Sequence, residues 1–249
     1  HFNDLGGNTG IVREELALAA AAARAGVSIV PDCGLAPGMG NSLAAYGIDA
    51  FDSPEDVRIL CGGLPQNPKP PLGYKQVFSL EGLTNEYTGE ALVLRDGKPA
   101  AVPAFTGLEV VDVPGLGTLE AFYTSGGTST CPETYAGKLR NYEYKTLRYP
   151  GHFAKIRPLI DLGLLDRTPI PVGDVTVRPR DVVHAVLGPR IAFPDDLDLV
   201  VLIVEVHGLK DGRRRTLRMT ILDRQDEKTG FSAMERTTAY PAAIVSILQ

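Results

Sequence analysis

The segment from Ile29 to Gly47 constrains the fold of this chain more than any other. It reads IVPDCGLAPGMGNSLAAYG, an apolar strand that runs directly into a turn rich in glycine and proline and then into a helix. In open α/β sheets, ligands bind at such junctions, beyond the carboxyl ends of the strands. Glycine lets the backbone approach a ligand closely, and a helix N-terminus favours negative charge. We therefore expect function around residues 32–41, although a plain connection has the same pattern.

Composition and charge exclude several classes of protein. The chain has 249 residues, enough for one large domain or two smaller ones, and its formal net charge of −5 offers no basic surface for nucleic acid or an anionic membrane. No apolar run has the length of a membrane span. Three cysteines without CxxC spacing argue against a disulfide framework and fit a reducing cytosol. The four histidines are dispersed. We predict a cytoplasmic protein with no metal site.

Apolar periodicity and turn residues predict an αβ fragment, then a mixed α+β domain built on a sheet, then a closing helix. Helices are expected over residues 14–24, 41–48, 152–162, 182–187 and 237–248, with Asn41 as an N-cap and Pro241 in the first turn of the last helix. Strands are expected over residues 27–30, 56–61, 76–80, 90–102, 108–113, 115–122 and 198–209, with a hairpin partner over 217–221.

Two features of the expected sheet carry further predictions. Arg95-Asp96-Gly97-Lys98 has the composition of a tight hairpin turn. The run Val200–Val206 is more apolar than a strand with one wet face normally is. This run predicts a homodimer formed through the sheet or through the helices that flank it, unless a second layer of helices within the same chain covers it.

Five strings in order resemble the saccharopine dehydrogenase-like family, and within it the lysine 6-dehydrogenase group. They are IVPDCGLAPGMGN, GGLPQNPKPPLGYK, SLEGLTNEYTGEALVLRDGK, KTLRYPGHF and TGFSAMERTTAYPAAI. The resemblance implies an oxidoreductase that uses NAD or NADP and acts on a small amino-acid substrate. It also implies a remnant of a Rossmann-type domain over residues 1–37, a substrate and dimerisation domain over 38–222, and a return toward the Rossmann domain over 223–249. The chain contains no Gly-x-Gly-x-x-Gly motif, so we expect it to be inactive alone and to bind NAD(P) weakly.

Oxidation of a C–N bond by hydride transfer requires a cationic clamp for the substrate carboxylate and a base for the ammonium proton. Arg148 is the candidate clamp, with a surface ion pair as the alternative. His152 is a candidate acid or base, with a buried or helix-capping histidine as the alternative. Tyr74 and Lys75 are further candidates for substrate contact. Glu86 could pair with the amine, although a charged residue in a strand is more often solvated.

Asp4 and Asp32 end the two strand fragments near the chain start, and two carboxylates at adjacent strand ends suit a cationic amine. Both are candidate catalytic residues. The turn that follows Asp32 supplies the candidate cofactor contacts Cys33, Gly34, Leu35, Pro37 and Gly38, with Cys33 as a small apolar filler rather than a nucleophile.

The segment SLEGLTNEY contains two acids and no Lys or Arg, whereas relatives that handle saccharopine are expected to be basic there. This favours lysine as substrate. The alternatives are a saccharopine or carboxynorspermidine dehydrogenase-type enzyme and a non-catalytic dimerisation module.

Overall fold

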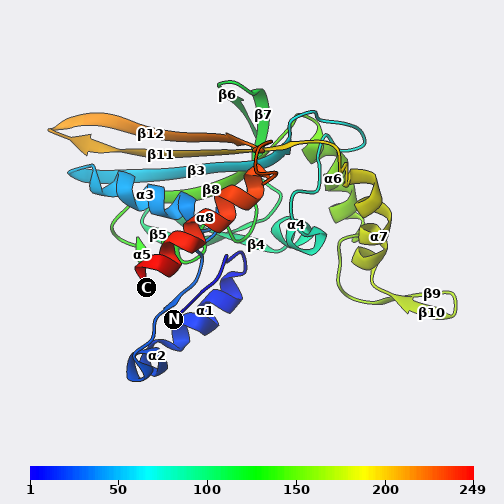
Figure 1. Ribbon diagram of the computed structural model, residues 1–249, viewed down its shortest axis with the longest axis horizontal. Helices are drawn as coiled ribbons and strands as arrows, with labels where there is room; N and C mark the ends of the chain where they lie inside the picture. Colours follow the sequence, from blue (N-terminus) through cyan, green and yellow to red (C-terminus); the bar gives the residue numbers. More distant parts are fainter.

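The computed structural model describes all residues from 1 to 249, and a mixed eight-stranded sheet forms its centre (Figure 1). The strand order is β12–β11–β3–β8–β4–β5, with β7 beside the end of β8 and β6 beside β7. Only β3 and β8 run parallel. The strands are β3 (Ser53–Pro65), β4 (Glu90–Arg95), β5 (Lys98–Pro103), β6 (Glu109–Val113), β7 (Gly117–Phe122), β8 (Asn141–Arg148), β11 (Asp198–Lys210) and β12 (Arg213–Arg224).

Both predicted hairpins are confirmed. Strands β11 and β12 are antiparallel, with Val200 opposite Asp223 and His207 opposite Thr216. Strands β4 and β5 are joined by Asp96 and Gly97, whose φ angles of 47° and 77° are those of a tight hairpin turn. Alternating apolar residues and turn residues are local signals, which is why both hairpins could be predicted from the sequence.

One chain buries both faces of β11. On one face Val200, Leu202 and Val204 lie in a core to which α3 (Met39–Asp49) and α8 (Ala233–Leu248) contribute, and Figure 1 shows both helices along the sheet. On the other face Val201 and Ile203 pack with Leu119 of β7. The second layer named as an alternative therefore exists within the chain, so the apolar run no longer argues for a dimer, which stays a prediction.

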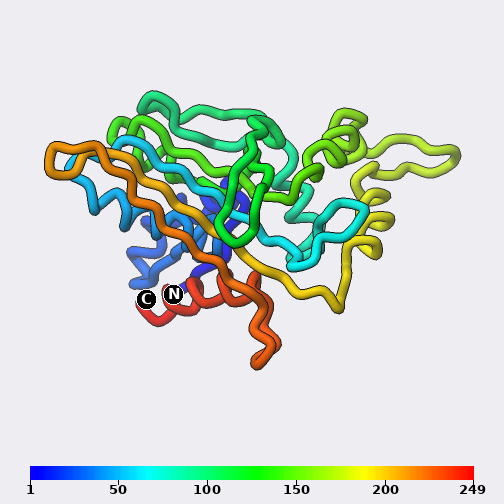
Figure 2. The backbone as a smooth tube through the Cα atoms, turned by 90° about the horizontal axis from the view of Figure 1, so that it is seen from above, coloured from blue at the N-terminus to red at the C-terminus, as the bar shows by residue number.

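The N-terminal segment forms a separate small unit. Strands β1 (Phe2–Asn3) and β2 (Ile29–Val30) make a two-stranded parallel sheet, connected by α1 (Thr9–Ala17) and α2 (Ala19–Ala25). Asn8 caps α1, and Gly26 ends α2 in the left-handed conformation. The end of α8 returns to this unit: Gln249 Nε2 donates to the Phe2 carbonyl over 3.0 Å, and the two termini are neighbours in Figure 2.

Two expected strands are wrong. Residues 76–78 are irregular, and α4 (Leu80–Glu86) replaces the strand region that was expected to hold Glu86. Ser79 caps this helix, since its hydroxyl accepts from the backbone N–H of Gly82 at 3.1 Å. Strand β3 also continues through Gly62 and Gly63, beyond its expected end at residue 61. A Cβ on Gly63 would lie 2.3 Å from the Met234 methyl of α8. Glycine there lets the helix approach the sheet.

Four helices begin earlier than predicted, since α1 already starts at Thr9 and the helix expected over 182–187 starts at Pro179. Helix α8 starts at Ala233 behind a capping box of Ser232 and Glu235, so Pro241 lies inside the helix rather than in its first turn. Helix α3 starts at Met39, so Asn41 is an interior residue whose side-chain oxygen accepts from the Tyr142 hydroxyl at 2.9 Å. The remaining elements are α5 (Cys131–Thr134), α6 (His152–Asp161), β9 (Ile170–Val172), β10 (Val175–Val177) and α7 (Pro179–Ile191).

None of the helices combines the length and the apolar character that crossing a membrane requires. The boundaries expected for the three parts of the chain, at residues 37 and 222, stay predictions.

Candidate functional site

A cavity of about 730 Å³ lies between the end of the main sheet and the loops of the N-terminal unit. One wall is formed by β3, β8, α4 and the first turns of α8, and the opposite wall by the loops that follow β1 and β2. The lining residues are Leu5–Asn8, Leu35–Pro37, Cys61, Gly63, Phe78, Ser79, Glu81, Gly82, Asn85, Glu86, Tyr144, Thr146, Arg148, Met234, Glu235, Thr238 and Ala239.

Strand β8 supplies three of these side chains by its two-residue repeat. Tyr144, Thr146 and Arg148 alternate along the strand and therefore share the face that lines the cavity. Leu147, between them, lies in the core on the other face. The sequence singled out Arg148 alone, but the strand period would have added the other two.

Arg148 is the most unusual charged group in the cavity. It is 2% exposed, and no carboxylate oxygen of the chain lies within 4.0 Å of its guanidinium. Its Nε donates to the Tyr87 hydroxyl and its Nη1 to the Leu147 carbonyl, both over 2.9 Å, while the guanidinium carbon lies 4.8 Å from the centre of the Tyr74 ring. The surface-pair alternative is wrong. A buried cation with no anionic partner can bind an anion that enters the cavity.

Glu86 lines the same cavity from the C-terminal end of α4. Burial raises the pKa of its carboxyl to about 7, against the opposing effect of the Arg148 charge. The expected strand position is wrong, and so is the fully solvated alternative. A carboxyl that titrates near neutrality can accept a proton from an amine at physiological pH.

Three predicted side chains lie outside the cavity. His152 is fully buried, and its Nε2 lies 3.0 Å from the Tyr87 hydroxyl. Burial, followed by the Arg148 charge, lowers the pKa of His152 to about 3. The structure therefore favours the buried alternative over an acid–base catalyst. Tyr74 lies beneath Arg148 without lining the cavity, and Lys75 donates to the carbonyls of Phe193 and Asp196 over 2.7 and 2.6 Å, which anchors a loop rather than a substrate.

Asp4 and Asp32 do lie at adjacent strand ends, as predicted from the sequence. Asp4 Oδ1 accepts from the backbone N–H groups of Gly6 and Asp32 over 2.8 and 2.9 Å, so it shapes the loop of the opposite wall. Burial and the charge of Asp4 raise the pKa of Asp32, while Ser129 opposes this. Neither carboxylate lines the cavity.

Only Leu35 and Pro37 of the five predicted cofactor contacts line the cavity. Cys33 is buried, and its Sγ donates to the Val30 carbonyl over 3.2 Å. Gly34 and Gly38 close the turn on itself, because a Cβ on Gly38 would lie 2.1 Å from the Gly34 carbonyl oxygen. These glycines serve the packing of the turn and leave no open cradle for a phosphate.

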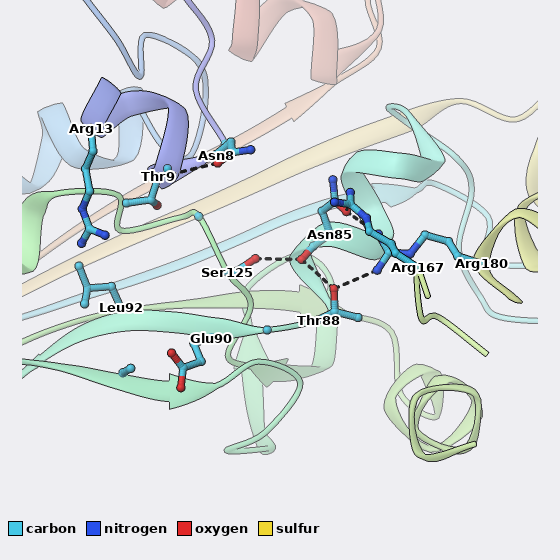
Figure 3. A pocket seen from close by; sticks show the side chains of 15 residues that line it. Asn8, Thr9, Arg13, Asn85, Thr88, Glu90, Leu92, Ser125, Arg167 and Arg180 are labelled. Atoms are coloured by element: carbon cyan, nitrogen blue, oxygen red, sulfur yellow. Dashed lines mark hydrogen bonds between the residues drawn. The ribbon is translucent and has the colours of Figure 1, made fainter. Parts of the chain in front are cut away.

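A smaller polar pocket of about 460 Å³ adjoins the cavity and shares Gly7, Asn8 and Asn85 with it (Figure 3). Arg13, Arg167 and Arg180 line it. Arg180 donates to Asn85 Oδ1 over 2.6 Å and to Thr88 over 3.2 Å, and Arg167 pairs with Glu81 and Asn85. The basic groups that SLEGLTNEY lacks are thus brought to it from a distant part of the chain.

The sequence reasoning also missed Gly82 and Asn85, which line the cavity with Glu86 from α4. The capping pattern from Ser79 to Gly82, followed by Glu86 four residues after Gly82, would have predicted a short helix with one face toward the site. The same reading would have placed Glu81 and Asn85 together. No group of three or more His, Cys, Asp and Glu side chains has a metal-binding arrangement.

Residues 34–249 match the family described as the saccharopine dehydrogenase C-terminal domain. The chain belongs to this family. Membership confirms the resemblance seen in the five sequence strings, while the lysine 6-dehydrogenase group within it stays a prediction.

Two solved structures share the fold, which confirms the predicted mixed sheet with flanking helices. The apo saccharopine dehydrogenase (L-Glu forming) from Saccharomyces cerevisiae has a TM-score of 0.71 at 20% identity, over 90% of this chain and 65% of that chain. A homospermidine synthase from Legionella pneumophila, solved in complex with NAD, has a TM-score of 0.51 at 12% identity, over 98% of this chain and 55% of that chain. This chain therefore spans less than two thirds of either structure.

Proposed function

We propose that this chain is the substrate-binding portion of an NAD(P)-dependent oxidoreductase that oxidises the side-chain amine of lysine. The observation that carries the proposal is the pair of groups in one cavity, a buried Arg148 without an ion pair and Glu86 with a pKa near 7. Family membership supports the reaction class, and the two charges support an amino acid as substrate.

Arg148 and Glu86 have different roles in this proposal. The planar guanidinium of Arg148 is suited to a carboxylate, which neutralises its buried charge. Glu86 in its ionised form accepts a proton from the substrate ammonium, so that the amine can lose hydride and become an imine. Water then hydrolyses the imine to an aldehyde and ammonia.

The bound nucleotide would supply the hydride acceptor. Leu35, Ala36 and Pro37 line the cavity wall opposite β8 and fit the nicotinamide end. The chain offers no Gly-x-Gly-x-x-Gly motif for the pyrophosphate. We therefore expect residues 1–249 alone to bind NAD(P) weakly and to show no lysine-dependent reduction of it, which calorimetric titration would test.

The polar pocket in Figure 3 supports a second candidate, a saccharopine-type substrate with an additional acidic arm. Arg167 is largely exposed there and could meet a second carboxylate, although Glu81 already pairs with it. This pairing is why lysine is the first candidate.

A substrate panel tests the proposal on the complete protein that contains this chain. Lysine, ornithine and saccharopine are assayed by nicotinamide absorbance with NAD and with NADP. We expect lysine to have the highest kcat/KM, and Glu86→Gln to abolish most of it. If saccharopine is best and Arg167→Ala removes that preference, the second candidate is correct. If no amino acid supports reduction, the non-catalytic alternative gains.

A further inference from the structure

Three buried polar side chains form a continuous line of hydrogen bonds that leads from the cavity wall into the core. Arg148 Nε lies 2.9 Å from the Tyr87 hydroxyl, which lies 3.0 Å from His152 Nε2. His152 Nδ1 lies 3.2 Å from the Leu72 carbonyl oxygen. Of the three side chains, only Arg148 lines the cavity.

The two ends of this line determine the direction of every bond in it. Arginine can only donate, so the Tyr87 oxygen accepts from Arg148. His152 Nε2 is the one other hydrogen-bond partner of this hydroxyl, and a buried O–H needs an acceptor, so the Tyr87 proton is directed to Nε2. A carbonyl can only accept, so the proton on His152 lies on Nδ1, which donates to the Leu72 oxygen. His152 is therefore neutral, with its proton on Nδ1. Burial and the Arg148 charge favour the same neutral form, since they lower the pKa of His152.

Aromatic packing holds the members of the line in place. The Tyr87 ring lies 4.9 Å from that of Phe105 and 6.0 Å from that of Phe122, measured between centres. Tyr74 meets the His152 ring edge-on at 5.7 Å and lies beneath the Arg148 guanidinium. With Nε and Nη1 of Arg148 both engaged by the chain, Nη2 is the guanidinium nitrogen that makes no hydrogen bond within it.

We propose that Tyr87 and neutral His152 are positioning residues, which orient the Arg148 guanidinium so that its free edge meets the substrate carboxylate. This rests on the proposed function insofar as Arg148 is the carboxylate clamp. Neither residue touches the substrate, so their effects must appear in substrate binding and must pass through Arg148.

Tyr87→Phe removes one hydroxyl and keeps the ring. In the complete protein we expect the KM for the amino acid to rise about 5- to 20-fold, because one hydrogen bond to a charged group is lost. The KM for the nucleotide and kcat should change less than about threefold. In an Arg148→Ala background the same substitution should have no further effect on the KM, since its partner is absent. An equal effect in both backgrounds would overturn the proposal.

A second substitution pair tests the histidine. His152→Leu should raise the same KM, whereas His152→Gln, which can still accept from Tyr87, should recover most of the wild-type value. Failure of both variants to change the KM counts against the proposal. If Arg148→Ala itself leaves the KM unchanged, the clamp and hence the proposed function fail. If only the Tyr87 and His152 variants are silent, the positioning role alone fails.

The wild-type protein provides a measurement that does not depend on how any variant folds. Nitrogen-15 NMR of the histidine rings should show His152 neutral and protonated on Nδ1 across about pH 5 to 8, unlike an exposed histidine, which titrates in this range. A proton on Nε2, or titration within that range, would contradict the direction of the hydrogen bonds.

Discussion

The two walls of the cavity carry ionisable groups of similar kinds in different settings. The wall made by β8 and α4 presents Arg148 and Glu86 to the cavity, with their surroundings packed by buried aromatic rings. The opposite wall carries Asp4 and Asp32 at the ends of two short strands. Asp4 Oδ1 accepts from the backbone N–H groups of Gly6 and Asp32, whereas Asp32 Oδ1 is buried without a hydrogen-bond partner. The first wall presents its charges to a ligand. On the second wall Asp4 binds backbone N–H groups, and neither carboxylate lines the cavity.

The comparison teaches that the partners of a charged residue, more than its type, decide its role. In the sequence Asp4, Asp32, Glu86 and Arg148 were comparable candidates. Arg148 stands out because it is buried with no carboxylate oxygen within 4.0 Å of its guanidinium, and Glu86 because it is half-buried with a raised pKa. Four predictions test this contrast, from the largest expected effect to the smallest.

The largest contrast is in stability. Leu202→Ala removes a fully buried side chain at the centre of the sheet and should lower the free energy of unfolding by about 3–4 kcal/mol. Leu16→Ala, at a side chain 48% exposed on α1, should change it by less than about 0.5 kcal/mol. Urea denaturation of both variants measures the difference. Equal losses would mean that the N-terminal unit is as well packed as the sheet.

Arg148→Ala should raise the KM for the amino acid about 10- to 100-fold, because a charge-assisted contact of about 1.5–3 kcal/mol is lost. The KM for the nucleotide should stay close to its wild-type value. The matched control is Arg218→Ala, since Arg218 pairs with Glu205 on the sheet, away from the cavity. Steady-state kinetics on the complete protein decide the outcome, and an unchanged KM for the amino acid removes Arg148 from the site.

Glu86→Gln should change how stability depends on pH. The folded pKa of about 7 lies above the ordinary value of 4.5 for a glutamate, so Glu86 makes the folded state less stable as pH rises between these values. At about pH 8 the glutamine variant should be more stable by about 2 kcal/mol, and at about pH 4 the two should be equal. Denaturation at both pH values tests this, with exposed Glu90→Gln as the control. A difference that does not depend on pH would contradict the raised pKa.

Asp32→Asn should have the smallest effect. The pKa of Asp32 is raised by burial and by Asp4, so its charge is disfavoured at neutral pH, and the amide should stabilise the protein by less than about 1 kcal/mol there. The gain should disappear below about pH 4. Asparagine also tolerates the φ of 61° at this position. Loss of stability at pH 7 would show that the ionised carboxylate has a stabilising partner.

The sequence alone determined the features that depend on near neighbours. The hairpins at Asp96–Gly97 and between β11 and β12 are read from the two-residue period of strands and from turn chemistry, and the helix that begins at His152 is read from the 3.6-residue period. The five ordered strings were enough to identify the family.

Only the tertiary structure decided what each candidate side chain does. The helix at Glu86, the glycines inside β3 and the burial of His152 were not predicted. They depend on contacts with α8, with β8 and with the aromatic core, all of which involve residues far away in the sequence. Arg167 and Arg180 reach SLEGLTNEY across more than eighty residues. Burial and pairing are sums over contacts that local patterns do not contain, and they decide which charges are free to act.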